Sequence, residues 1–164
     1  MTFEGEVWRY LPRGAHPLDL SFLLQADGRW NRAGEYACLY TSLTRNGAIA
    51  EYDKWLGQRV GLMPRDDAER DLVTIRVRLA SVCDVTDAGV RRRLGVTREA
   101  ITRDTTASLE LCRTIADWAR ARQYGAILSP SAAAGSANNL NIYIDVRPAD
   151  IELAVGSHCE ALNY

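Results

Sequence analysis

The stretch Val73-Thr74-Ile75-Arg76-Val77-Arg78-Leu79 decides the class of fold. Apolar residues occupy every second position, and polar or charged residues stand between them. A period of two is typical of a strand with one buried and one exposed face. We therefore expect a half-buried strand here, which needs partner strands and a core beneath it.

Patterns on both sides of this strand predict the rest of the fold. The longest helix is expected at residues 107–123, where apolar side chains recur at helical spacing and Gly125 follows as a terminator. Further helices are expected at 47–56, 88–94 and 98–103, and further strands at 36–40, 125–128, 140–144 and 151–155. The elements do not alternate as β-α-β units. We therefore predict an α+β fold: a single compact domain over residues 1–164, with a mixed, mostly antiparallel sheet and flanking helices.

The charge balance argues against nucleic acid as a direct partner. The 164 residues carry 20 Lys and Arg against 21 Asp and Glu, a net charge of −1. Nucleic-acid binding normally requires a basic excess. The one basic run, at residues 91–93, is interpreted as a solvated helix face.

Several other classes are disfavoured by composition. No stretch approaches the roughly 20 apolar residues that span a bilayer, and the N-terminus is acidic rather than signal-like. We therefore expect a cytoplasmic protein that does not bind membranes. The four cysteines are far apart and there are only two histidines. A metal site is not expected, and the thiols should be free.

A Gly-Arg-Trp-Asn motif begins at Gly28, and Gly34 follows shortly after it. The glycines allow a sharp turn or close approach to a ligand. The planar guanidinium of Arg29 matches a diphosphate. The alternative is that Arg29 stacks on Trp30 or pairs with Asp27.

Tyr40 and Glu51 form a second candidate pair. Tyr40 is expected to end a strand, and Glu51 shares a face of its helix with Ala48 and Trp55. A carboxylate on a partly apolar face needs a partner or a function. The alternative is a helix-edge Glu that pairs with Lys54 or with an arginine.

A third candidate is the small, polar segment that begins Ser129-Pro130-Ser131 and ends at Asn138 and Asn139. Lying between two predicted strands, it offers hydroxyl, amide and backbone N–H groups to a ligand. The alternative is a plain flexible loop. A serine nucleophile is disfavoured because no G-x-S-x-G elbow is present.

Taken in this order, the motifs resemble the RES-domain family, named for an Arg, a Glu and a Ser. The matching features are Trp8-Arg9, Gly28-Arg29-Trp30-Asn31 with Gly34, the apolar strand with Tyr40, the helix with Glu51, Ser129-Pro130-Ser131-Ala132, and residues 138–142. Ser131 fits the family serine better than Ser129 does. The resemblance covers residues 8–144, and residues 56–103 do not align within it.

The resemblance implies a fold similar to ADP-ribosyltransferase toxins and NAD⁺ as the substrate. It implies cleavage of the nicotinamide–ribose bond, with ADP-ribose passed to water or phosphate, or to a specific metabolic protein of the host. It also implies a type II toxin that inhibits growth. The expected partner is an antitoxin with an Xre-like or ParS-like part, which blocks the cleft in a hetero-oligomer.

The resemblance also suggests a role for each site residue. Glu51 would stabilise a ribosyl cation, Arg29 would clamp the diphosphate, Tyr40 would contact the nicotinamide ribose, and Ser131 would bind the nicotinamide end or a phosphate. Trp30 and the Asn138-Asn139 pair are further binding candidates. Two other classes stay open: a nucleotide-binding module without turnover, and a structural or partner-binding protein.

Overall fold

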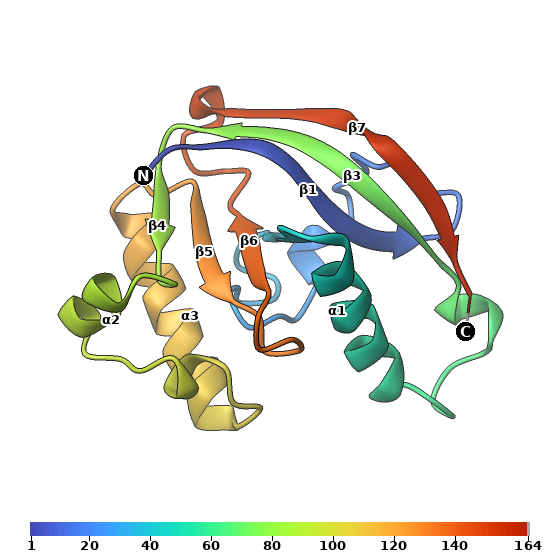
Figure 1. Cartoon of the computed structure of the whole chain (residues 1–164), viewed down its shortest axis with the longest axis horizontal. Coiled ribbons are helices and arrows are strands. Elements are labelled where there is room, and N and C mark those ends of the chain that lie inside the picture. The colour runs from blue at the N-terminus through green and yellow to red at the C-terminus, as the bar shows by residue number, and fades with distance from the viewer. Residues whose placement is uncertain (164) are drawn as a thin grey trace.

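One curved sheet of seven strands runs through the protein (Figure 1). In the computed structural model, which describes residues 1–163, the strand order is β4-β5-β6-β2-β1-β3-β7. The strands are β1 (Phe3–Pro12), β2 (Leu39–Ser42), β3 (Arg70–Leu79), β4 (Val82–Asp84), β5 (Ala126–Pro130), β6 (Asn138–Ile142) and β7 (Ile151–Leu162). β4 and β5 are parallel, and the other neighbouring pairs are antiparallel. The expected mixed, mostly antiparallel sheet is confirmed.

Three helices and four short 3₁₀ turns accompany the sheet. The helices are α1 (Arg45–Gly57), α2 (Ala88–Leu94) and α3 (Thr106–Ala121), and the turns are at Leu23–Gln25, Asp66–Ala68, Glu99–Ile101 and Pro148–Asp150. Each helix begins at a residue whose side chain accepts a backbone N–H of its first turn: Thr44, Asp87 and Thr105. These caps fix where the helices start, and the predicted α2 is confirmed at both ends.

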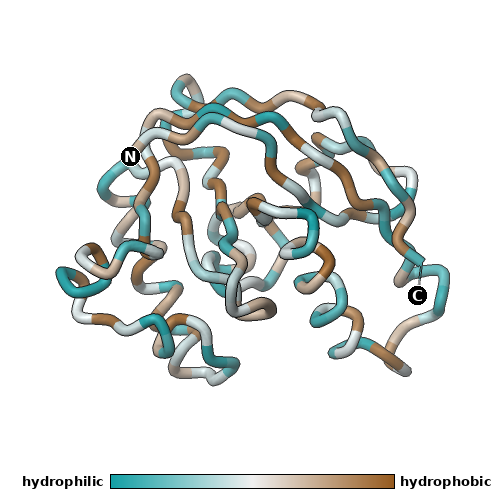
Figure 2. The backbone as a smooth tube through the Cα atoms, viewed as in Figure 1, coloured by the Kyte–Doolittle hydropathy of each residue, from teal (hydrophilic) through white to brown (hydrophobic). Residues whose placement is uncertain are grey.

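β3 has the predicted alternation over residues 75–79, but Thr74, expected on the exposed face, is fully buried where the register with β7 shifts. Ile75, Val77 and Leu79 are buried, while Arg76 and Arg78 are exposed. The same change of hydropathy from residue to residue is visible along this strand in Figure 2. The strand begins earlier than predicted because its first residues also pair with both neighbours, β1 and β7.

The sheet curves around one of two apolar clusters. In that cluster Val7 of β1 and Ile75 of β3 pack with Leu128, Leu140 and Ile142 of β5 and β6. Figure 1 shows β1, β3 and β7 arching across the top of the other strands. The second cluster packs α3 against the opposite face of β5. Both faces of the central strands are thus buried.

Of all neighbouring strands in the sheet, β1 and β2 share the fewest paired residues. These strands pair at a single position, Trp8 with Ser42, and then diverge. The ladder is therefore divided into two halves, β4-β5-β6-β2 and β1-β3-β7, that pair with each other at this one position. α1 lies beside this junction and contacts both β1 and β2.

Near the N-terminus one predicted boundary was wrong and one strand was missed. The strand expected at 36–40 runs instead over Leu39–Ser42. Tyr36 and Cys38 precede β2 and, within the described part of the chain, do not pair with another strand. Their side chains are buried in the apolar cluster under α3, which explains the apolar pattern there. β1 was not predicted, although its residues Val7, Arg9 and Leu11 alternate as buried positions.

Three further boundaries differ for local reasons. The helix expected at 98–103 is only the turn Glu99–Ile101, anchored by buried Ile101. α3 is ended by the left-handed conformation of Gln123 (φ 63°), and not by Gly125. β5 continues through Pro130, so Ser129 lies in a strand and not in a loop.

Candidate active site

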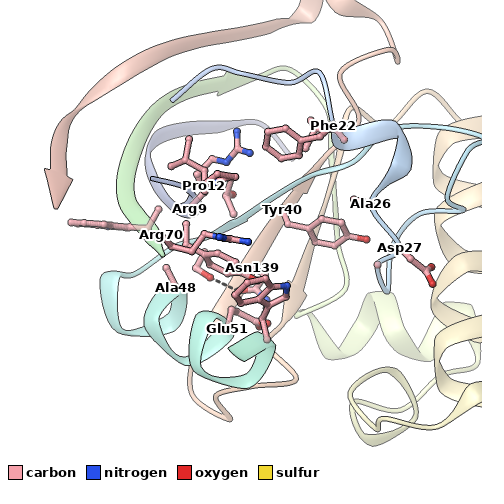
Figure 3. Close-up of a pocket in the computed structure, with 18 of the residues that line it drawn as sticks. Arg9, Pro12, Phe22, Ala26, Asp27, Tyr40, Ala48, Glu51, Arg70 and Asn139 are labelled. Atoms are coloured by element: carbon pink, nitrogen blue, oxygen red, sulfur yellow. Dashed lines mark hydrogen bonds between the residues drawn. The ribbon is translucent and has the colours of Figure 1, made fainter. Parts of the chain in front are cut away.

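A cleft of about 500 Å³ opens where β1 and β2 diverge. Its walls are residues 8–12 of β1, residues 40–42 of β2, and Glu51 and Trp55 of α1. Figure 3 shows Arg9 on one side of this space and Glu51, Asn139 and Arg70 on the other. A smaller hollow of about 220 Å³ continues past Glu51 to Arg29. The larger volume alone falls within the range of small-molecule sites.

Glu51 is held by one of its two oxygens. Its Oε1 accepts hydrogen bonds from Ser131 Oγ and Asn139 Nδ2, each at 2.7 Å. Ser42 Oγ in turn donates to Asn139 Oδ1 at 2.8 Å. Within residues 1–163, Oε2 forms no hydrogen bond and the carboxylate forms no ion pair. Glu51 therefore presents a fixed negative charge with one oxygen unbonded at the wall of the cleft.

Ser131 is oriented by the turn that follows β5. Its Oγ accepts the backbone N–H groups of Ala133 and Ala134, both at 3.0 Å, while its proton goes to Glu51. Ser129 is fully buried and instead accepts a hydrogen bond from Asn141 Nδ2. Of the two serines, only Ser131 touches Glu51. With its proton committed to a carboxylate, Ser131 is placed to position Glu51.

Tyr40 holds the motif that begins at Gly28. Its hydroxyl accepts the Trp30 backbone N–H and donates to Asn31 Oδ1, both at 2.8 Å. Asn31 Oδ1 also accepts the Gly28 N–H at 3.0 Å. A Cβ at Gly28 would overlap the Tyr40 hydroxyl, so close approach explains this glycine. Burial, with the neighbouring Cys38, raises the pKa of Tyr40 well above its usual value, so the hydroxyl stays neutral.

Arg29 is anchored in the smaller hollow. Its guanidinium donates to the carbonyl oxygens of Ile101 and Arg103 and to Ser108 Oγ, at 3.3, 2.9 and 3.1 Å. It also pairs with Asp104 at 2.9 Å, and the Arg29 side chain is only 12% exposed. Asp27 pairs with Arg113 and not with Arg29. The alternative partner for Arg29 suggested by the sequence was therefore wrong.

The alternative proposed for Glu51 was also wrong. Lys54, the suggested partner, pairs instead with Asp104 at 2.7 Å. Asp104, a half-exposed residue, thus lies between the cations of Arg29 and Lys54.

Arg9 is a site residue that the motif reasoning did not select. It is 4% exposed, lines the larger cleft and lies 5.7 Å from the Phe22 ring centroid. Its Nη1 donates to the Pro17 carbonyl at 3.2 Å, but within residues 1–163 it forms no ion pair. Burial lowers its pKa to about 10, a shift that Asp19 partly offsets. The signal was present, because Arg9 shares the buried face of an alternating strand with Val7 and Leu11.

The remaining candidates separate into two groups. Asn139 contacts Glu51, while Asn138 uses its carbonyl to accept the Leu43 N–H. Trp30 is 2% exposed and belongs mainly to the apolar cluster under α3, although it borders the smaller hollow. The fold thus brings Glu51, Ser131 and Asn139 into contact and places Tyr40 and Arg29 around them.

Comparison with known proteins decides the family. The model of the RES domain matches residues 6–159. The chain belongs to the RES domain family. The fold of this RES domain is also similar to a chain in the crystal structure of the M. tuberculosis MbcT–MbcA toxin–antitoxin complex, with a TM-score of 0.74 and 20% identity. That alignment covers 98% of this chain and 85% of the other. A search of curated protein sequences finds no match.

Two further features describe this RES domain. Within residues 1–163, no group of three or more His, Cys, Asp or Glu side chains could hold a metal ion. Over the same part of the chain, no helix is both long and apolar enough to cross a membrane.

Proposed function

We propose that this RES domain binds NAD⁺ and breaks its nicotinamide–ribose bond, passing ADP-ribose to water or phosphate without a metal. The observation that carries the proposal is the state of Glu51. Its carboxylate is fixed through one oxygen, has no counter-ion within residues 1–163, and borders a cleft large enough for a small molecule. A carboxylate left in this state is suited to a positive charge that appears only during a reaction.

The reaction needs that kind of stabilisation. Nicotinamide leaves as a neutral molecule, so it requires no proton from the enzyme. Positive charge develops on the ribose in an oxocarbenium-like transition state. The unbonded Oε2 of Glu51 would face this charge, and Ser131 and Asn139 would keep the carboxylate from rotating.

Two arginines are proposed to bind the diphosphate. Arg9 is buried without a carboxylate partner, so a bound phosphate would supply its missing counter-ion. Arg29 is already paired with half-exposed Asp104, which a phosphate could replace. Tyr40 would offer its ring to the nicotinamide ribose, since its hydroxyl is occupied within the loop.

We also propose that the chain is the toxin of a type II toxin–antitoxin pair and acts in the cytoplasm. The family membership and the fold shared with a chain of a toxin–antitoxin complex support this. The partner would be an antitoxin with an Xre-like or ParS-like part that covers the cleft in a hetero-oligomer.

The decisive test is nicotinamide release from NAD⁺ by the purified chain. We expect release together with free ADP-ribose or its phosphate ester. Modification of one cellular protein, detected by mass spectrometry with NAD⁺ pools intact, would indicate a mono-ADP-ribosyltransferase. Binding of NAD⁺ without any nicotinamide release would leave a nucleotide-binding module.

A further inference from the structure

Two guanidinium groups lie against one indole ring at the wall of the larger cleft. The Cζ atoms of Arg59 and Arg70 are 4.9 and 4.2 Å from the Trp55 ring centroid. Arg59 follows the end of α1, and Arg70 is the first residue of β3. Both arginines belong to residues 56–103, the part of the chain in which the motif comparison identified no site residue.

Neither guanidinium has an anionic partner within residues 1–163. Arg70 donates to the backbone carbonyls of Asp67 and Glu69, at 2.7 and 2.8 Å. Arg59 makes only a long bond of 3.4 Å to the Trp55 carbonyl. Burial lowers the pKa of Arg70, and the charge of Arg59 adds to this, against raising effects of Tyr10, Tyr52 and Asp67. Two partly buried positive charges therefore face the cleft without a counter-ion.

The arginine pair lies close to Glu51. Glu51, Trp55 and Arg59 follow one another at four-residue spacing, the spacing that keeps side chains on one side of a helix. Tyr10, whose ring is 6.0 Å from that of Trp55, connects the two groups. Its pKa is raised to about 12 by burial and by the charge of Glu51, against opposing effects of Arg59 and Arg70. The hydroxyl of Tyr10 is thus close enough to the Glu51 carboxylate and to both guanidinium groups for each charge to act on its pKa.

We propose that Trp55, Arg59 and Arg70 form a subsite for a phosphate group beside the reacting centre. Two cations match the charge of about −2 that a phosphate carries near neutral pH. Guanidinium forks match phosphate oxygens, and stacking on an aromatic ring orients them before the ligand arrives. The inference rests on the proposed function for what the phosphate does, but its binding can be measured without turnover.

The phosphate group could come from either of two sources. Inorganic phosphate could be the acceptor: the bond from the ribose carbon to nicotinamide breaks, and nicotinamide leaves with the bonding electron pair. An oxygen of HPO₄²⁻ then bonds to that carbon, and because the oxygen is already charged, no proton has to be removed. The other source is the diphosphate of NAD⁺ itself, in which case Arg59 and Arg70 would share its binding with Arg9 and Arg29.

The first measurement is binding of inorganic phosphate to the purified full chain, followed by ³¹P NMR. We expect saturable binding that weakens about tenfold or more in Arg59→Gln and in Arg70→Gln, the scale of one lost charge-assisted contact. Arg92→Gln is the matched control, because Arg92 is exposed on α2 and away from the cleft. Thermal melting of each variant verifies that β3 still forms when Arg70 is changed.

The second measurement separates the two sources. If phosphate is the acceptor, it will accelerate nicotinamide release and appear in the product as an ester on the ribose carbon. If the subsite takes the diphosphate of NAD⁺, phosphate will inhibit competitively, and Arg59→Gln will raise KM. Either result supports the subsite, provided that Arg92→Gln behaves as wild type.

Other outcomes would refute either the phosphate subsite or the proposed function, and they distinguish between the two. Phosphate binding that is absent, or that survives in a folded Arg59→Gln/Arg70→Gln double variant, would refute the subsite. So would a turnover rate that does not respond to phosphate at all. Binding that depends on the two arginines in a protein that releases no nicotinamide would instead refute the proposed function and leave the subsite standing.

Discussion

Glu51 combines a fixed position with an unbonded oxygen, so its charge and its shape can be tested separately. Glu51→Gln keeps the shape and removes the charge. We expect turnover to fall by about two orders of magnitude or more, the scale of one lost preorganised electrostatic contact. NAD⁺ affinity should change much less, because the charge acts mainly in the transition state. Nicotinamide release and NAD⁺ binding measured on one sample will decide this.

The matched control for Glu51 is Glu35→Gln. Glu35 is exposed and lies outside the cleft, so its loss should alter neither rate nor affinity. Near-normal turnover in Glu51→Gln would remove Glu51 from the mechanism.

Ser131 is expected to act through Glu51. Ser131→Ala deletes one of the two donors to Oε1, so we expect kcat to fall about tenfold or more with little change in KM. Ser131→Thr keeps the hydroxyl and should recover part of the rate. The control is Ser129→Ala, which removes a buried hydroxyl bonded to Asn141 and should cost stability but not kcat. Equal losses of kcat in both alanine variants would contradict the positioning role.

We expect Arg9 to strengthen NAD⁺ binding and to lower the free energy of unfolding. A buried charge with no ion pair is costly, and apolar replacement of even a buried ion pair is often neutral or stabilising by about 1–4 kcal/mol. We expect Arg9→Met to raise the free energy of unfolding and to weaken NAD⁺ binding. Because burial lowers the pKa of Arg9 from its usual value to about 10, the cost is fully present below pH 10 and declines only above it. Urea unfolding across the neutral range should therefore show a constant gain, and a loss of stability would disprove the unpaired state.

At the scale of elements, the loop from Gly28 to Asn31 depends on close packing against Tyr40. A methyl group at Gly28 would overlap the Tyr40 hydroxyl, so Gly28→Ala should destabilise the protein by about 1–3 kcal/mol and weaken NAD⁺ binding. Gly57→Ala is the matched control, because nothing lies within 4 Å of a Cβ added there. Chemical denaturation of the two variants should separate them clearly. Similar stability for both would mean that the loop tolerates displacement of Tyr40.

The elements that the sequence predicted well are those with a regular period. The alternation over residues 75–79 and the helical spacing in α3 arise from a single buried face, which a sequence pattern records directly. β4, with three residues, is too short to have a period. Tyr36 and Cys38 resembled a strand only because loop residues can also be buried.

At the scale of the whole molecule, the site was harder to predict than the elements. Glu51 and Ser131 were selected as separate motifs, but their hydrogen bond depends on β2 and β6 pairing next to α1. Arg9 was matched only as part of the Trp8-Arg9 pair and was given no role in the site, and Arg59 and Arg70 lie in no motif used for the prediction. Arg9 and Arg70 reach the cleft because β1 and β3 pair along their full length, and Arg59 reaches it because α1 packs against β1. No local sequence pattern records this long-range arrangement.

The proposed function also has a consequence for cells. Expression of the chain without an antitoxin should stop bacterial growth, and intracellular NAD⁺ should fall before growth stops. Glu51→Gln at equal protein level should leave both unchanged. Growth arrest with NAD⁺ maintained would argue against depletion and favour modification of a protein target.

The single pairing of Trp8 with Ser42 has one more consequence. Ser42 joins the two halves of the sheet through its backbone, and through its hydroxyl it begins the hydrogen-bond chain that ends at Glu51. We therefore expect any relative movement of the two halves to shift the position of the Glu51 carboxylate. A ligand that bridges the halves would damp that motion, and slower amide hydrogen exchange at the junction would record it.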